Sequence, residues 1–153
     1  MKYETILGAT DFSEHGDAAL GRAAALAASS NARLIAFHVL PEPEAPSPLL
    51  AHYDVEVTKD RIEQAKREAA AELEKRIPEA LRQAGLDVEY LVSFGDPASE
   101  ILEADAKRHP DLIVVSTHGR RGWQRWIMGS VAERVLQMAK ADVLAVRRRA
   151  RSE

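Results

Sequence analysis

The sequence contains no cysteine. This absence excludes disulfides, zinc–thiolate sites and thiol catalysis, and it is compatible with a reducing compartment. No apolar run approaches the roughly 18 residues of a membrane span. The first residues, MKYETILGATDF, show neither the apolar region nor the cleavage pattern of a signal peptide. We therefore expect a cytoplasmic protein without membrane insertion.

An excess of positive charge is also missing. The formal net charge of the 153 residues is −3, which argues against a general nucleic-acid-binding surface. The basic run RRRAR begins at Arg147, and its simplest interpretation is a solvated tail. The length favours a single domain with a core that needs no disulfides. We expect this domain to cover residues 1–147 and the basic tail to cover residues 148–153.

Short β-like runs alternate with longer helical patterns along the chain. Pro78 should kink or split the longest helix, and the proline-rich stretch PEPEAPSP should form a loop. The alternation predicts an α/β fold, in which helices cover both faces of a parallel sheet. The expected strands are residues 3–9, 33–40, 88–92, 111–116 and 141–147, and the expected helices are residues 17–29, 55–84, 98–108 and 130–139.

In such sheets, ligands bind beyond the carboxyl ends of the strands, where the strand order reverses. This rule selects Thr10-Asp11, after the first strand, and residues 116–130, after the fourth. Asp11 is suited to accept hydrogen bonds from a ribose or an adenine edge, or to help hold a metal ion. The alternative is that Asp11 is the N-cap of the first helix.

Residues 116–133 read STHGRRGWQRWIMGSVAE and combine glycines with arginines. Gly119 and Gly129 permit close approach of a ligand to the backbone, and Gly129-Ser130 stands at an expected helix N-terminus, which favours an anion. Arg120, Arg121 and Arg125 add positive charge suited to a polyphosphate. The segment matches neither G-x-x-x-x-G-K-[ST] nor G-x-G-x-x-G.

The same segment also has an interpretation without a ligand. Ser130 and Glu133 fit the S-x-x-E capping box, with Ser130 as the N-cap, and the arginines fit a solvated face. His118 would either meet a phosphate or form a turn. Trp123 and Trp126 have the spacing of a helical turn and are expected to pack on the protein or on a partner subunit.

No nucleophile with an identifiable base partner emerges from the sequence. The pattern G-x-S-x-G is missing, and Ser130 has no base partner that the sequence identifies. The five histidines are scattered and form no compact metal-binding pair. These observations do not indicate an enzyme.

Four segments carry a resemblance to a known family: ILGATDFSEHGDAAL, LIAFHVL, GDPASEIL and DLIVVSTHGRRGWQRWIMGSVAERVLQMAKADVLAVR. The chain resembles a single-domain universal stress protein of the ATP-binding kind over nearly its whole length. The family pattern is G-x2-G-x9-G-[ST]. Gly119, Gly129 and Ser130 fit its second part, whereas Ser116 stands where the family has its first glycine.

The resemblance implies an open five-stranded sheet with strand order 3-2-1-4-5, of the adenine-nucleotide alpha-hydrolase-like type. It implies that Asp11 contacts adenosine, that the Val39 backbone meets the adenine, and that Val115 lines the base or ribose. Phosphates would lie on Gly119, Gly129, Ser130 and Val131. The complete set of nucleotide-binding residues that we expect is Thr10, Asp11, Val39, Val115, Ser116, His118, Gly119, Arg120, Gly129, Ser130 and Val131.

The function implied by the resemblance is that of an ATP-binding stress or regulatory protein. It would act as a homodimer through the last strand, from Ala141 to Arg147, with Mg²⁺ bridging the phosphates and with AMP or another adenine nucleotide as alternatives to ATP. Two other hypotheses stay open. One is a slow ATP hydrolase, and the other is a nucleotide-free dimerisation module, which Ser116 favours.

Overall fold

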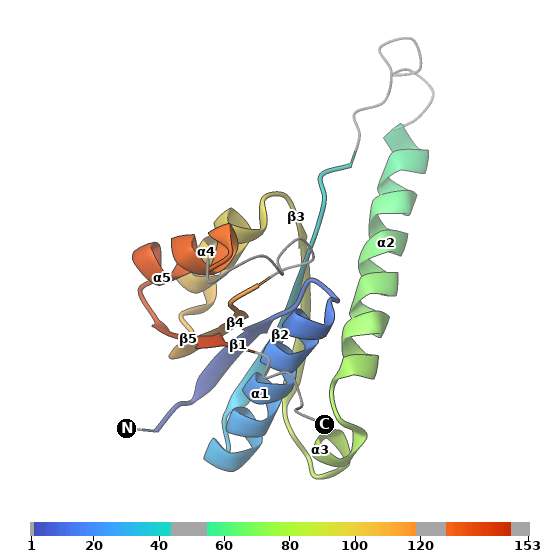
Figure 1. The fold of residues 1–153 in the computed structure, drawn as a ribbon. Coiled ribbons are helices and arrows are strands. Elements are labelled where there is room, and N and C mark those ends of the chain that lie inside the picture. The colour runs from blue at the N-terminus through green and yellow to red at the C-terminus, as the bar shows by residue number, and fades with distance from the viewer. Residues whose placement is uncertain (1, 44–54, 119–127, 148–153) are drawn as a thin grey trace, which may run out of the picture.

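The structure is a computed structural model that describes residues 2–43, 55–118 and 128–147, with only the backbone described at residues 55–58. Five parallel strands form one sheet in the order β3-β2-β1-β4-β5 (Figure 1). The predicted fold class and strand order are therefore confirmed. The strands are β1 (Thr5–Ala9), β2 (Arg33–Leu40), β3 (Val88–Phe94), β4 (Leu112–Ser116) and β5 (Asp142–Val146).

The helices follow the predicted alternation. Pro78 separates α2 from α3 and has no backbone N–H to continue the helical hydrogen bonds, so the predicted break is confirmed. Among the described helices, none is long and apolar enough to cross a membrane. The helices are α1 (Glu14–Ser30), α2 (Val55–Arg76), α3 (Glu79–Gln83), α4 (Pro97–Arg108) and α5 (Ser130–Met138).

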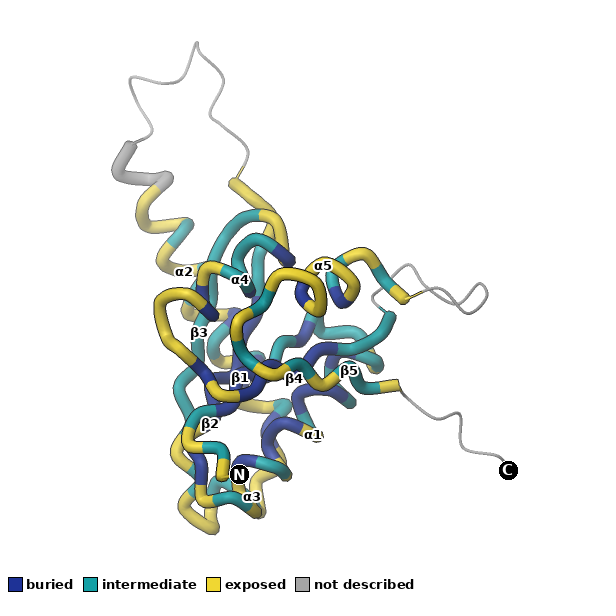
Figure 2. Tube along the Cα trace, turned by 90° about the vertical axis from the view of Figure 1, so that its left-hand side faces the viewer, coloured by how far each residue is buried: buried dark blue, intermediate teal, exposed yellow. Residues whose placement is uncertain are grey.

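The sheet is buried on both faces because successive side chains of a strand point in opposite directions. On one face, Leu34 and Val114 pack with Leu20 of α1 and Leu73 of α2. On the other face, a second cluster joins the sheet to α4 and α5. Figure 2 shows this arrangement as buried chain gathered along the central strands, with exposed chain around it.

Strands β1 and β4 lie side by side at the centre, with Ile6 paired to Leu112 and Gly8 to Val114. Strand β1 leads into α1 on one face, whereas α5, which follows β4 along the chain, packs on the other face. The connections after these two strands therefore diverge, and their carboxyl ends adjoin at the point where the strand order reverses. This is the place at which parallel sheets bind ligands.

Candidate functional site

The turn after β1 holds a half-buried carboxylate at the carboxyl edge of the sheet. Asp11 Oδ1 accepts hydrogen bonds from the Ser13 backbone N–H, at 3.0 Å, and from the Ser13 hydroxyl. Thr10 is buried, and its backbone N–H donates to the Phe37 carbonyl of β2 at 3.0 Å. The turn is thereby anchored to the neighbouring strand while Asp11 stays at its outer side.

Helix α1 begins three residues earlier than the sequence indicated, at Glu14 instead of Asp17, and its N-cap is Ser13. The Ser13 hydroxyl oxygen accepts from the Gly16 N–H at 3.1 Å. The alternative that Asp11 itself caps α1 is therefore wrong. The carboxylate orients the capping serine instead, because the Ser13 hydroxyl hydrogen points to Asp11.

Gly16 lies directly beneath this turn. A β-carbon at Gly16 would stand 2.5 Å from Asp11 Oδ1, 2.7 Å from Thr10 Oγ1 and 2.8 Å from the Asp11 backbone nitrogen. Only a residue without a side chain permits this closeness between α1 and the turn. In the sequence, Gly16 stands one residue before the expected start of the helix at Asp17, so no signal pointed to this role.

Phe12, in the middle of the turn, lies between a histidine and an arginine. Its ring stacks on His38 of β2, with centroids 3.8 Å apart and planes inclined by 17°. Arg76 of α2 makes a cation–π contact with the same ring, and its guanidinium carbon lies 4.4 Å from the Phe12 ring centroid. His38 is buried, and its Nδ1 lies 2.8 Å from the Thr10 carbonyl. Because a carbonyl only accepts, this nitrogen carries the hydrogen.

Arg76 is also tied to two carboxylates. Its Nε donates to Asp17 Oδ1 at 2.9 Å, and its Nη1 donates to Glu72. Burial on its own lowers the pKa of the guanidinium, but the hydrogen bond to Glu72 and the attraction to Asp17 outweigh burial and raise that pKa. The same hydrogen bond from Arg76, followed by the one from Lys75, lowers the pKa of the Glu72 carboxyl.

The end of β4 meets the start of α5 through the backbone. The Gly129 N–H donates to the Thr117 carbonyl at 2.7 Å, and the Thr117 N–H donates to Val146 of β5 at 3.0 Å. Val115 is buried, and the hydroxyl of half-buried Ser116 donates to the His118 carbonyl at 2.8 Å. These bonds bring the N-terminus of α5 to the carboxyl edge of β4, as the ligand interpretation requires.

The predicted capping box at α5 is wrong. Gly129 is the N-cap, with extended backbone angles, and the Glu133 N–H donates to the Gly129 carbonyl at 3.0 Å. Ser130 is consequently the first helical residue and lies one position too late to cap. Within the described residues, no side-chain hydrogen bond caps this helix. An uncapped N-terminus presents backbone N–H groups and the positive end of the helix dipole, which suit an anion.

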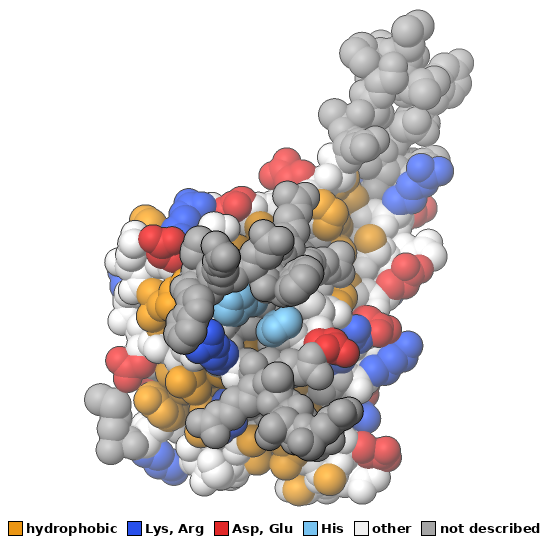
Figure 3. Space-filling view, viewed as in Figure 1, with side chains coloured by type: hydrophobic (Ala, Val, Ile, Leu, Met, Phe, Trp, Pro, Cys, Tyr) orange, Lys and Arg blue, Asp and Glu red, His pale blue; other side chains and the backbone are white. Residues whose placement is uncertain are grey.

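The start of α1 and the segment after β4 approach each other through two histidines. The ring centroids of His15, in the first turn of α1, and His118, after β4, are 6.0 Å apart. Figure 3 shows histidine side chains together on this face of the molecule. Half-buried Val39, at the end of β2, lies on the other side of β1. Nine of the eleven predicted site residues thus belong to adjoining segments at one edge. Gly119 and Arg120 lie outside the described residues, as do Trp123 and Trp126.

Residues 2–147 match the family model of the Universal stress protein family. The chain belongs to the universal stress protein family. The family predicted from the sequence is therefore confirmed. Universal stress protein A homolog 1 of Coxiella burnetii is 34% identical over 151 residues, covering 95% of this chain and 97% of the relative. Universal stress protein MJ0577 of Methanocaldococcus jannaschii is 28% identical, covering 97% of this chain and 98% of the relative.

Solved structures of universal stress proteins share the fold. The structure of MJ0577 superposes with a TM-score of 0.77 at 26% identity and covers 98% of this chain and 99% of its own. A universal stress protein solved in complex with cAMP superposes with a TM-score of 0.64 at 28% identity, covering 96% of this chain and 98% of its own.

In this universal stress protein, sequence reasoning missed Phe12, Gly16, His38 and Arg76 near the site. Phe12 offered one signal, because an apolar side chain inside a polar turn needs something to pack against. His38 and Arg76 offered none, since the strand and helix patterns that contain them do not reveal which residue faces the turn.

Proposed function

We propose that this universal stress protein binds ATP at the carboxyl edge of β1 and β4 and acts as a nucleotide-dependent regulatory homodimer. The observation that carries the proposal is the hydrogen bond between Gly129 and Thr117. It joins the uncapped N-terminus of α5 to the end of β4, next to the strand that ends in Asp11. A universal stress protein 28% identical to this one was solved with cAMP, which supports an adenine nucleotide as the ligand class.

In this proposal the adenosine end of the ligand lies toward β1 and β2. Asp11 accepts hydrogen bonds from the ribose or adenine, the Val39 backbone meets the base, and Val115 lines it. Thr10 supports this end through the turn that it anchors to Phe37 of β2. These are residues with hydrogen-bonding or apolar surfaces and no excess of charge, as a nucleoside requires.

The phosphates lie toward α5 in the same proposal. Backbone N–H groups of Gly129, Ser130 and Val131 and the Ser130 hydroxyl hold them, with His118 alongside. Gly119 and Arg120, which lie outside the described residues, stay predicted phosphate contacts. The positive end of the helix dipole favours their negative charge. Ser116 stands in place of a glycine, and the bond of its hydroxyl to the His118 carbonyl supports the proposal that the phosphates still fit beside it.

Mg²⁺ fits this site only as a companion of the phosphates. Within the described residues, no group of three or more histidine, cysteine, aspartate or glutamate side chains is arranged to hold a metal ion. Mg²⁺ commonly takes most of its ligands from phosphates and water, with one or two carboxylates from the protein. The phosphate oxygens would therefore supply the ligands, and the ion would neutralise their charge.

The test has two parts. Denaturing extraction of the purified protein, followed by chromatography and mass spectrometry, should release an adenine nucleotide. Thermal unfolding with ATP and Mg²⁺ should show stabilisation of about 2.7 kcal/mol at a ligand concentration 100 times Kd. No released nucleotide, together with no shift at millimolar ATP, would refute the proposal.

The homodimer is proposed to form through β5, at the edge of the sheet. Its only strand neighbour is β4, so one side of β5 presents unpaired backbone groups within the described part of the chain. Leu144 on this strand is 36% exposed. An exposed apolar edge strand favours pairing with another chain, and a second copy of β5 is the partner that would cover both edges.

A further inference from the structure

Phe12 holds a backbone conformation that its surroundings must maintain. Its φ of 62° lies in the left-handed region, which residues with a β-carbon occupy sparsely. Asp11, the residue proposed to contact adenosine, immediately precedes Phe12. Whatever keeps Phe12 in this conformation therefore also holds the backbone between Asp11 and Ser13, whose N–H and hydroxyl bind the Asp11 carboxylate.

The ring of Phe12 is held from both sides. His38 supplies a nearly parallel surface at 3.8 Å, and its own ring is fixed by the bond between Nδ1 and the Thr10 carbonyl. Arg76 covers the opposite region of the ring at 4.4 Å. A planar guanidinium can stack on an aromatic face, and a lysine in its place would supply charge without this flat surface.

Hydrogen bonds also link Arg76 to the backbone of Phe12 through two intervening side chains. Asp17 Oδ1 accepts from Arg76 Nε and from the Thr10 hydroxyl, both at 2.9 Å. The Thr10 hydroxyl oxygen in turn accepts from the Phe12 N–H at 2.9 Å. Arg76 thus contacts the turn twice, once through the aromatic ring and once through Asp17 and Thr10. The end of α2 is joined in this way to the segment that carries Asp11.

We infer that Arg76, acting through Phe12, is a positioning residue that preorganises Asp11 for the nucleotide and couples α2 to the site. This inference rests on the proposed function. A turn already held in its binding conformation loses less entropy when the ligand binds, so the stack contributes to affinity without touching the nucleotide. The stack, and not the charge of Arg76 alone, carries the effect.

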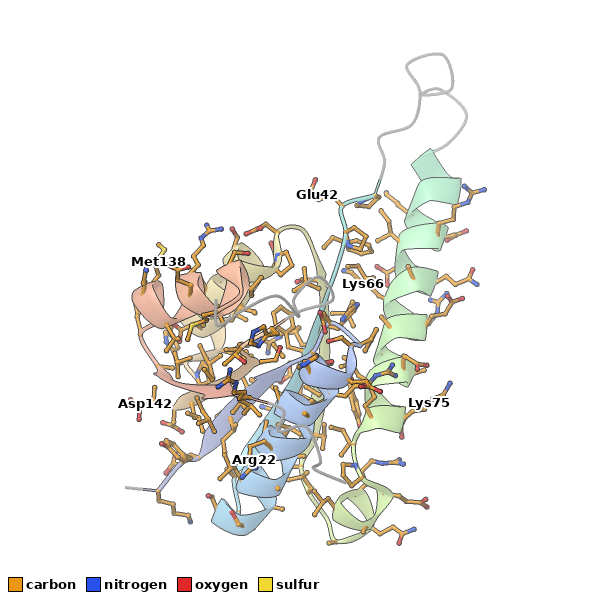
Figure 4. The ribbon with its side chains drawn as sticks, in the orientation of Figure 1. Arg22, Glu42, Lys66, Lys75, Met138 and Asp142 are labelled. Carbon is orange, nitrogen blue, oxygen red and sulfur yellow. The ribbon has the colours of Figure 1, made fainter. Side chains whose placement is uncertain are left out.

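The experiment measures ATP affinity by calorimetry in the presence of Mg²⁺. Arg76→Gln and Phe12→Leu should each weaken binding about tenfold, and Arg76→Lys should recover only part of the loss. Arg67 is exposed on the same helix, so Arg67→Gln is the matched control and should bind like wild type. Lys75, on the outer side of α2 in Figure 4, is not used as a control, because it bonds to Glu72, which also binds Arg76.

Two readouts separate positioning from general stability. The double variant Phe12→Leu/Arg76→Gln should bind ATP no more weakly than whichever single variant has the lower affinity, because both changes disrupt the same contact between Arg76 and Phe12. Amide hydrogen exchange at Phe12 and Ser13 should accelerate in Arg76→Gln and not in Arg67→Gln. Leu34→Ala removes a fully buried side chain at the amino end of β2, the edge of the sheet opposite the turn, and serves as a comparator of lowered stability.

Each outcome decides the inference. If wild type binds ATP and the Arg76 and Phe12 variants bind equally well, the inference is refuted and the proposed function stands. If Leu34→Ala weakens binding as much at a comparable melting temperature, the effect is general destabilisation and the inference is also refuted. If wild type does not bind ATP, the proposed function fails and the inference falls with it.

Discussion

Replacing Gly16 with alanine should push helix α1 away from the Asp11 turn. The added β-carbon would lie 2.5 Å from Asp11 Oδ1 and 2.8 Å from the Asp11 backbone nitrogen. Contacts below 3.0 Å with backbone atoms require a shift, because the backbone cannot rotate away as a flexible side chain can. Gly21 lies in the same helix, and a β-carbon there would meet nothing within 4 Å, so Gly21→Ala is a matched control.

The magnitude follows from two opposing terms. Alanine in place of glycine in a helix stabilises by about 0.5–1 kcal/mol, and both variants gain a similar amount. Overpacking at a tight position costs about 1–3 kcal/mol, and only Gly16→Ala incurs it. The two variants should therefore differ in unfolding free energy by about 1–3 kcal/mol, which corresponds to roughly 2–12 °C in melting temperature for a domain of this size.

Denaturant and thermal unfolding of both variants would measure this difference, and an ATP titration would measure its functional consequence. We expect Gly21→Ala to be more stable than wild type and to bind ATP equally well. Gly16→Ala should lose at least about tenfold in affinity, since a displaced carboxylate forfeits a charge-assisted hydrogen bond. Equal stability of the two alanine variants would refute the argument from packing beneath the turn.

Three further predictions concern other parts of the molecule. Hydrogen bonds from the Ser99 hydroxyl and then its N–H, with Arg134 adding to them, lower the pKa of the Asp96 carboxyl. A lowered folded-state pKa gives stability that is present above the unfolded-state pKa and lost as pH falls through the folded one. Unfolding measured against pH should therefore show a weaker acid dependence in Asp96→Asn than in wild type, and Asp96→Ala should cost about 1 kcal/mol at neutral pH through loss of the α4 N-cap. Leu144→Lys should shift the protein from dimer to monomer in sedimentation velocity with little change in melting temperature, and a dimer that persists would argue against pairing through β5. Ser116→Gly should leave ATP affinity within about threefold of wild type (under 1 kcal/mol), whereas binding seen only in this variant would support a nucleotide-free dimerisation module.

The sequence by itself determined the succession of strands and helices and the parallel class of the sheet. Strand β2 has the predicted bounds, and β4 differs by one residue at its start. These predictions succeed because the apolar patterns are local and because Pro78 cannot continue a helix whatever surrounds it. The order of the strands came from the family resemblance, since periodicity does not say which strands are neighbours.

Tertiary structure decided the details of the site. The caps of α1 and α5 fall on Ser13 and Gly129 because a cap depends on the backbone angles of one residue, which several nearby residues could adopt. The contact of Phe12 with His38 and Arg76 joins a turn, a strand and a helix that are distant along the chain. Sequence patterns report which face of an element is apolar, and only the packed fold decides which side chains meet.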